Sequence, residues 1–292
     1  MGIGGPASLY LEAATPEAFI AAQSLLRSEN MDVTVIGEGS NLIVADAGFR
    51  GAVLRLVNRE MRAEGTTVYV DGGVTLQSLV DFTVAEGLQG LETMTGIPGS
   101  VGAAVYGNAG AYGHSISERV QTARFHNGET LREIDNEGCQ FHYRESIFKK
   151  RKDWVIVSAT LAMQPGDAAA LQQKSAGILD IRNRKYPPTM KCAGSIFKNY
   201  LLAELPPAVA AQVPPKVIIE GKIPSAWFLE QVGAKGIRLG GIQVADYHAN
   251  LIYNDGGGTA RDLVTVIADL KQRILDRFRI PLEEEVQYIG FA

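Results

Sequence analysis

Several features that mark other protein classes are missing or scarce in this sequence. Its 292 residues include only two cysteines, Cys139 and Cys192, and no Cys-x-x-Cys pair, so nothing indicates a disulfide framework or a metal site. No apolar run approaches the ~18–20 residues that a membrane helix needs, and the amino terminus lacks the charged-then-apolar pattern of a secretory signal. We therefore expect a cytoplasmic protein with no membrane partner and no bound metal.

Clusters of basic residues are also missing. Lys+Arg total 28 against 32 Asp+Glu, a net charge of −4, and no block of Lys and Arg occurs. This balance argues against nucleic acid as a partner. A hydrophobic content of 46% with 21% charged residues is typical of a globular protein. A single core is near its practical limit at this length, so two or three domains are expected. No coiled-coil pattern appears, and we expect a monomer.

Short strands and a few helices are predicted along the whole chain. Strands are expected at residues 33–36, 42–44, 51–56, 67–70, 154–157 and 285–289. Helices are expected after Thr15, over residues 76–84, through residues 171–178, over residues 225–232 and after Thr259. The last helix is the best defined, because Thr259 and Asp262 can cap it and its apolar residues form one face. This alternation predicts an α+β protein.

A glycine turn, Gly37-Glu38-Gly39-Ser40-Asn41, follows the first of these strands. A Gly-x-Gly after a strand invites comparison with the dinucleotide-binding fingerprint, in which glycines let a pyrophosphate approach the backbone. The third glycine of that fingerprint is missing, and a strand rather than a helix follows. On this motif alone, a tight turn between strands is therefore the better explanation.

A second glycine-rich segment, Gly96 to Gly113, is harder to explain by packing alone. It holds six glycines in eighteen residues and has few side chains large enough to build a core. Such a segment suits a place where the backbone approaches a ligand and offers N–H groups to a phosphate or a flat ring. The alternative is a crossing of small residues between packed elements. Together, the two glycine-rich segments favour a large phosphate-bearing cofactor.

Three polar residues stand in otherwise apolar segments: Arg144, Ser195 and Glu285. Each has an ordinary structural explanation when it is taken alone. Arg144 could form a surface ion pair, Ser195 could cap a helix, and Glu285 could be a solvated residue of the final strand. Composition and spacing therefore support a cofactor-binding enzyme and identify no reaction.

Seven blocks of the sequence resemble the UDP-N-acetylenolpyruvoylglucosamine reductase family. The blocks are Gly37–Leu42, Gly96–Ala103, Asn108–Gly113, Tyr143–Ser146, Gly194–Asn199, Gly241–Val244 with His248–Asn250, and Leu282–Val286. They occur in the order of the family and cover nearly the whole chain. The resemblance implies an FAD-binding region of two α+β subdomains, as in vanillyl-alcohol-oxidase (PCMH-like) flavoproteins, and a carboxyl-terminal α+β substrate-binding domain. We expect these three domains at residues 1–56, 57–165 and 166–292.

The resemblance also implies a reaction. The family reduces the enolpyruvyl ether of UDP-N-acetylglucosamine enolpyruvate to the lactyl ether, which gives UDP-N-acetylmuramate for peptidoglycan. NADPH reduces non-covalently bound FAD, which passes hydride to the vinyl β-carbon. Arg144 would stabilise the enolate that forms, Ser195 would donate the proton to the α-carbon, and Glu285 would be the second group that faces the enolate.

The remaining site residues are carried over from the same resemblance. Lys198, Asn199 and Gln243 are expected to bind the substrate. The residues expected to contact FAD are Gly37, Glu38, Gly39, Ser40, Asn41 and Leu42 in the first segment, and Gly96, Ile97, Pro98, Gly99, Ser100, Gly102, Ala103, Asn108, Ala109, Gly110, Ala111 and Tyr112 in the second.

The sequence departs from the family pattern in several places. Glu38 stands where the family has glycine, which puts a carboxylate near the expected pyrophosphate. Tyr200 and Glu284 replace prolines. The short interval from Arg144 to Ser195 resembles the form without the tyrosine-bearing lid insertion, and we expect that a short leading segment of the family is absent.

Two other functions compete with the reductase. The first is a related FAD-dependent oxidase of an alcohol or another sugar, and such enzymes often attach flavin through His or Cys. It would leave the Ser195 and Glu285 blocks unexplained. The second is a catalytically silent flavin- or nucleotide-binding protein, in which loss of Arg144, Ser195 or Glu285 would be expected, and all three are present.

Overall fold

The computed structural model describes residues 1–291, and these residues fall into two compact units. Unit 1 comprises Met1–Pro6, Ser40–Arg50 and Pro188–Ala292, and unit 2 comprises Ala7–Gly39 and Gly51–Pro187. The chain therefore crosses between the units within the first glycine turn, at Gly39 and Ser40. The boundaries of these units differ from those of the three expected domains. The helix that follows Pro165 was expected in the third domain, and it belongs to unit 2.

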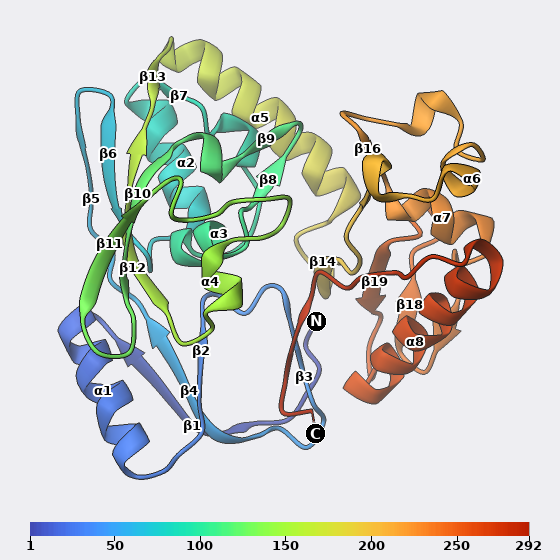
Figure 1. The fold of residues 1–292 in the computed structure, drawn as a ribbon, viewed down its shortest axis with the longest axis horizontal. Helices are drawn as coiled ribbons and strands as arrows, with labels where there is room; N and C mark the ends of the chain where they lie inside the picture. The colour runs from blue at the N-terminus through green and yellow to red at the C-terminus, as the bar shows by residue number, and fades with distance from the viewer. Residues whose placement is uncertain (292) are drawn as a thin grey trace. The chain divides into compact units, whose positions relative to one another are not determined.

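Unit 2 is built around an antiparallel five-stranded sheet (Figure 1). Its strands, in spatial order, are β11 (Leu131–Asp135), β10 (Val120–His126), β12 (Val155–Ala162), β6 (Thr67–Asp71) and β5 (Met61–Glu64). Alternate residues of β6, Val68 and Val70, are buried, as expected for a strand with one covered face. The helices α2 (Leu76–Ala85) and α3 (Val101–Tyr106) supply the residues that pack on that face.

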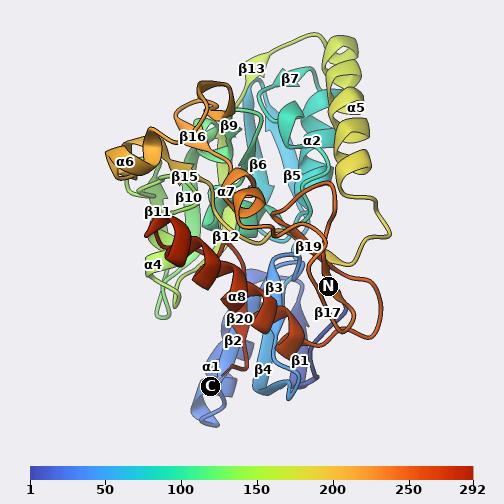
Figure 2. The ribbon, with the colours of Figure 1, turned by 90° about the vertical axis from the view of Figure 1, so that its right-hand side faces the viewer.

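The long helix α5 (Ala168–Lys185) completes this core by lying beside α2, which Figures 1 and 2 both show. Smaller elements of unit 2 are β7 (Leu88–Gln89), η1 (Glu92–Met94), β8 (Gly110–Ala111), β9 (His114–Ser115), η2 (Ile116–Glu118), α4 (Ile147–Lys150) and β13 (Gln164–Pro165).

A second, three-stranded sheet has the order β1 (Ala7–Ala13), β4 (Phe49–Leu56), β2 (Val33–Ile36). Strands β2 and β4 are parallel and are packed by the helix α1 (Pro16–Ser28), whose Phe19 is fully buried. Thr15 caps α1 by accepting a hydrogen bond from the Ala18 N–H at 3.1 Å, as its sequence predicts.

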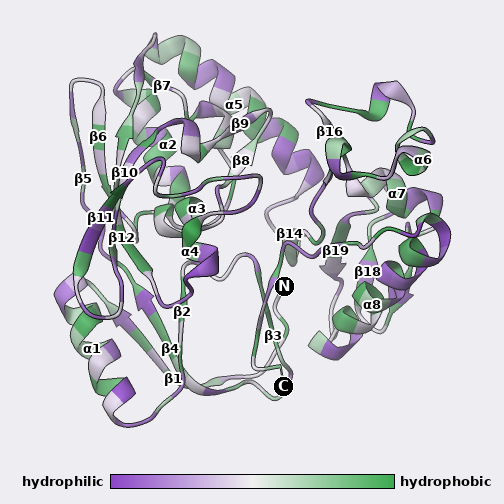
Figure 3. Cartoon of the chain, in the orientation of Figure 1, coloured by the Kyte–Doolittle hydropathy of each residue, from purple (hydrophilic) through white to green (hydrophobic). Residues whose placement is uncertain are grey.

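Unit 1 contains an antiparallel four-stranded sheet in the order β14 (Cys192–Ser195), β19 (Leu251–Asn254), β18 (Ile242–Val244), β17 (Arg238–Leu239). The helices α7 (Ser225–Gln231) and α8 (Ala260–Phe278) pack against it. In α8 the apolar residues lie on one buried face, and Figure 3 shows hydrophobic and hydrophilic residues alternating along it. The capping box of Thr259 and Asp262 is present.

Two segments of unit 1 leave this core. Between Asn199 and Ser225 the chain forms β15 (Tyr200–Leu201), η3 (Leu202–Glu204), α6 (Pro207–Ala210), η4 (Pro215–Val217) and β16 (Lys222–Ile223), and β15 pairs with β16. At the carboxyl end, β20 (Gln287–Ile289) pairs in parallel with β3 (Leu42–Val44).

The α+β prediction is confirmed, and two local predictions need correction. The final strand begins at Gln287 rather than at residue 285, so Glu285 lies outside it. The reason is that Glu284 forms an isolated bridge with Phe197 before the chain turns to pair with β3. The helix α3 was not predicted from the sequence, because its glycine and alanine content hides the helical pattern. No helix among residues 1–291 is long and apolar enough to cross a membrane.

Candidate active site

The two glycine-rich segments meet in unit 2. A Cβ atom at Gly37 would lie only 2.7 Å from Ser100 Oγ and 3.2 Å from Ala103 Cβ, so the first turn packs directly on the start of α3. Gly39 has φ = +70°, a conformation that side chains other than glycine rarely adopt. The packing explains why small residues are needed at both places, and it joins two segments that lie far apart in the sequence.

The second segment follows the backbone of the sheet closely. Ser100 caps α3, with Oγ accepting from the Ala103 N–H at 3.3 Å. The Gly102 N–H donates to the Gly72 carbonyl at 2.8 Å, and a Cβ at Gly102 would lie 3.1 Å from that oxygen. Further along, a Cβ at Gly110 would lie 2.4 Å from the His114 carbonyl. These glycines therefore let backbone pack on backbone, and the segment has few bulky side chains that would keep a dinucleotide from its N–H groups.

Glu38 does not present a free carboxylate to this turn. Its side chain is paired with the Arg55 guanidinium on β4, and Arg55 also contacts Glu12 Oε1 at 3.3 Å. A hydrogen bond with Tyr10 and these two carboxylates raise the pKa of Arg55, which stays charged. The sequence departure at residue 38 is therefore compensated within unit 2.

Arg144 is held against the second glycine-rich segment. Its backbone is left-handed, with φ = +55°, and its Nη2 donates to the Gly110 carbonyl at 3.1 Å. Lys149 Nζ donates to the Arg144 carbonyl at 2.8 Å. On either side, Asn108 Nδ2 donates to the His142 carbonyl at 2.8 Å, and Ser146 Oγ donates to the Tyr106 carbonyl at 2.6 Å. The predicted catalytic arginine is thus attached to the predicted FAD-binding segment.

Ser195 and Glu285 are brought together in unit 1. Ser195 ends β14, opposite Leu251 of β19. The next residue, Ile196, accepts a hydrogen bond from the Glu285 N–H at 2.8 Å, and the Lys198 N–H donates to the Glu283 carbonyl at 2.9 Å. Ninety residues therefore separate two segments whose main chains are directly bonded.

The predicted substrate residues also lie in unit 1. Lys198 Nζ is 2.5 Å from Glu283 Oε1. Asn199 Oδ1 accepts from the Ser225 N–H at 3.2 Å, which fixes it at the start of α7. Gln243 lies on β18, where its Oε1 accepts from Arg238 Nη1 at 3.3 Å. Lys198 and Asn199 thus share a segment with Ser195, whereas Gln243 lies on another strand of the same sheet.

One structural residue of the site was missed by sequence reasoning. Asn250, only 2% exposed, donates from Nδ2 to the Phe197 carbonyl and to Ser225 Oγ, both at 2.8 Å. Its Oδ1 accepts from the Phe197 N–H at 2.9 Å. The Asn250 side chain therefore bonds the main chain of Phe197 as a neighbouring strand would. Sequence reasoning gave Asn250 no role of its own, because this role depends on which residues lie beside Phe197, and no local pattern indicates them.

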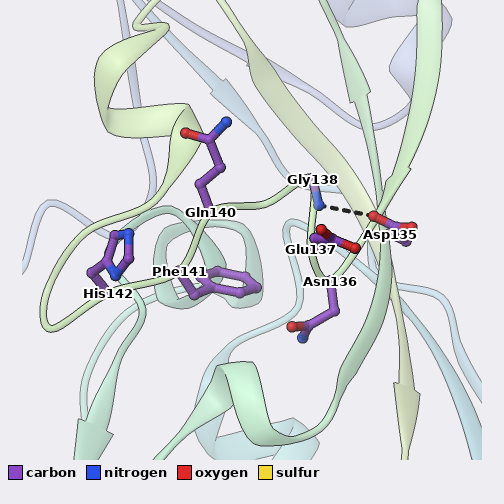
Figure 4. Close-up of a pocket in the computed structure, with 7 residues that line it drawn as sticks. All are labelled: Asp135, Asn136, Glu137, Gly138, Gln140, Phe141 and His142. Carbon is purple, nitrogen blue, oxygen red and sulfur yellow. Dashed lines mark hydrogen bonds between the residues drawn. The ribbon is translucent and has the colours of Figure 1, made fainter.

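A cavity of ≈ 730 Å³ opens beside the turn after β11 (Figure 4). Its lining consists of Asp135, Asn136, Glu137, Gly138, Gln140, Phe141 and His142. The Gly138 N–H donates to Asp135 Oδ1 at 2.8 Å, which closes the turn. The predicted site residues do not line this cavity, and we assign it no role in the reaction.

Comparison with known families defines the class of protein first. Residues 7–132 match the model described as the FAD binding domain, and residues 186–289 match the model described as the UDP-N-acetylenolpyruvoylglucosamine reductase carboxyl-terminal domain. At Gly37, Gly102 and Gly110 a Cβ would meet protein atoms, so these glycines let the two segments pack closely, and the segments keep few bulky side chains where FAD would approach the backbone. The chain is therefore an FAD-dependent oxidoreductase.

Individual relatives identify the family. The chain is 61% identical over 289 residues to the UDP-N-acetylenolpyruvoylglucosamine reductase of Solibacter usitatus. The alignment covers 99% of this chain and 93% of that protein. It is 35% identical to the enzyme of the same name from Bacillus subtilis, over 99% of the chain and 90% of that protein. The crystal structure of the reductase from Thermus caldophilus superposes with a TM-score of 0.74 at 26% identity, over 96% of this chain and 92% of that one. The chain belongs to the UDP-N-acetylenolpyruvoylglucosamine reductase family.

Proposed function

We propose that this chain reduces the enolpyruvyl group of UDP-N-acetylenolpyruvoylglucosamine to give UDP-N-acetylmuramate, a precursor of peptidoglycan. FAD, held by the two glycine-rich segments, would supply the hydride for the vinyl β-carbon, with NADPH as the source of the two electrons. The observation that carries the proposal is the 61% identity over 99% of the chain, together with the presence of Arg144, Ser195 and Glu285. The reaction consumes one hydride and one proton, and this chain must deliver the proton.

Arg144 is proposed to stabilise the negative charge that hydride addition leaves between the α-carbon and the carboxylate. A planar guanidinium suits a delocalised oxyanion, provided that it is fixed before the reaction. Two features support such fixing: the left-handed backbone of Arg144 and the hydrogen bond from its Nη2 to Gly110. One nitrogen of the guanidinium, Nη2, is thereby hydrogen-bonded to the protein's own main chain.

Ser195 is proposed to donate the proton to the α-carbon. A serine hydroxyl is a poor acid in water, so a neighbouring group must hold and polarise it. Glu285 is the second group proposed to face the enolate, and it can help only when it is protonated or hydrogen-bonded, since an ionised carboxylate would repel the enolate. The main-chain hydrogen bond between Ile196 and Glu285 supports a joint action of Ser195 and Glu285.

Substrate binding is proposed for Lys198, Asn199 and Gln243. Lys198 suits a diphosphate, because its partner Glu283 is 70% exposed and can be solvated when the phosphate replaces it. NADPH and the sugar nucleotide are proposed to use the same site in turn. We further propose that the enzyme works as a monomer in the cytoplasm, with FAD-binding subdomains at residues 1–56 and 57–165 and a substrate domain at 166–292.

Separate half-reactions test these roles. Ser195→Ala should leave the rate of flavin reduction by NADPH within about threefold of the unmodified enzyme, and slow reoxidation by the sugar nucleotide about 10²- to 10⁴-fold. Stopped-flow absorbance of the flavin measures both rates. Equal loss of the two rates would contradict the proton-donor role.

A further inference from the structure

Asn41 closes the first glycine turn, where it is expected to contribute to FAD binding, yet its side chain contacts a different part of unit 1. Its Nδ2 donates a hydrogen bond to the Glu285 carbonyl at 2.9 Å. Its own carbonyl accepts from the Gln287 N–H at 3.0 Å. Asn41 therefore spans the residues on which Glu285 depends, although 244 positions separate the two in the sequence.

Glu285 lies where the chain changes partner. On its amino-terminal side, Glu284 forms a bridge with Phe197, and the Glu285 N–H donates to Ile196. On its carboxyl-terminal side, the parallel pairing of β20 with β3 begins at Gln287 opposite Leu42. Between the two ladders, the Asn41 amide donates to the Glu285 carbonyl. A buried or half-buried carbonyl without such a donor is costly.

The hydrogen bond to the Glu285 carbonyl needs an amide at residue 41 in particular. An aspartate at residue 41 would have nearly the same shape but could only accept, and it would face the carbonyl with an oxygen.

We propose that Asn41 is a positioning residue for the reduction of the sugar nucleotide, acting through the main chain of Glu285. The Asn41 amide holds the carbonyl of Glu285, and the carbonyl of Ile196, next to Ser195, holds its N–H, so the main chain of Glu285 is hydrogen-bonded on both sides. Asn41 therefore belongs to the turn that is expected to bind FAD, and its side chain also contacts the segment that carries Glu285. This inference rests on the proposed function, in which Glu285 faces the enolate.

The test compares Asn41→Ala and Asn41→Asp with a matched control, Asn136→Ala. Asn136 in unit 2 also donates its amide to main-chain carbonyls, those of Ser117 and Val120 at 2.8 and 2.7 Å. For each holoenzyme we would measure the dissociation constant for FAD by titration of the apoprotein, the rate of flavin reduction by NADPH, and the rate of flavin reoxidation by saturating UDP-N-acetylenolpyruvoylglucosamine.

Both Asn41 variants should reoxidise about 10- to 100-fold more slowly when fully loaded with FAD, since a small displacement of a reacting group is enough for such a loss. Reduction by NADPH should slow much less than reoxidation does in the loaded Asn41 variants, and the control should match the unmodified enzyme in both rates. A merely structural role for Asn41 would slow the two half-reactions equally, whereas the proposed role slows reoxidation selectively.

Two results would overturn the inference. In the first, the Asn41 variants bind FAD more weakly but, once loaded, reoxidise at the unmodified rate, which would make Asn41 a cofactor ligand only. In the second, both half-reactions slow equally. Failure of the unmodified enzyme to reoxidise with the sugar nucleotide would instead refute the proposed function, so the two failures are distinguishable.

Discussion

Removal of the Asn250 side chain should destabilise unit 1 markedly. It makes three hydrogen bonds at 2.8 to 2.9 Å, two to the main chain of Phe197 and one to Ser225 Oγ. Phe197 is 1% exposed and Ser225 is 0% exposed, so water cannot replace the lost partners without opening the core. Each bond contributes about 1 kcal/mol net, and groups left unsatisfied add to the loss, so Asn250→Ala should lower the free energy of unfolding by about 3–5 kcal/mol.

Urea unfolding monitored by tryptophan fluorescence measures this loss. The chain has two tryptophans, Trp154 in unit 2 and Trp227 on α7 in unit 1. In a Trp154→Phe background the remaining signal reports unit 1. Gln212→Ala, also in unit 1, serves as the control, because its exposed amide makes one hydrogen bond, to the Ala208 carbonyl at 3.0 Å, and should cost about 1 kcal/mol or less. A loss for Asn250→Ala no larger than that of the control would refute the argument that its bonds hold the segment after Ser195.

Three further predictions concern unit 2 and the cofactor. Arg55→Met should leave the Glu38 carboxylate unpaired and weaken FAD binding severalfold, and the double variant Arg55→Met/Glu38→Gln should restore it in an FAD titration; additive losses would contradict the pairing. Burial lowers the pKa of His126 from its ordinary 6.5, so the unfolded chain binds the proton more readily and the free energy of unfolding should fall as pH drops below 6.5. His126→Gln should flatten that slope between about pH 5 and pH 7 in urea titrations, and an unchanged slope would assign it to other groups. Trichloroacetic acid should release all flavin into the supernatant, whereas flavin in the protein pellet would favour the competing oxidase with covalent attachment.

Local chemistry made the helices and the glycine turns predictable. Thr15 with Pro16, and Thr259 with Asp262, cap the helices α1 and α8 through neighbours three residues away, so the signal lies within one short segment. The glycines of both cofactor segments were recognised for the same reason, since a positive φ or a blocked Cβ restricts one position at a time. Helix α3 escaped prediction because its small residues show no apolar stripe.

Non-local pairing could not be predicted. Glu285 was expected in the final strand, but its place depends on Ile196 and Asn41, which lie far away in the chain. The compensation of Glu38 by Arg55 depends equally on the parallel pairing of β2 with β4. A strand register is set by partners distant in sequence, so no window of neighbouring residues contains the information. The roles of Asn41 and Asn250 became visible only with that register.

The most direct test of the proposed function is the oxidation of NADPH by the purified, FAD-loaded protein, followed by the absorbance of NADPH with and without UDP-N-acetylenolpyruvoylglucosamine. We predict a rate that depends on the sugar nucleotide and formation of UDP-N-acetylmuramate in equal amount to the NADPH consumed. A yellow, FAD-loaded protein that oxidises NADPH no faster with the sugar nucleotide than without it would contradict the proposal.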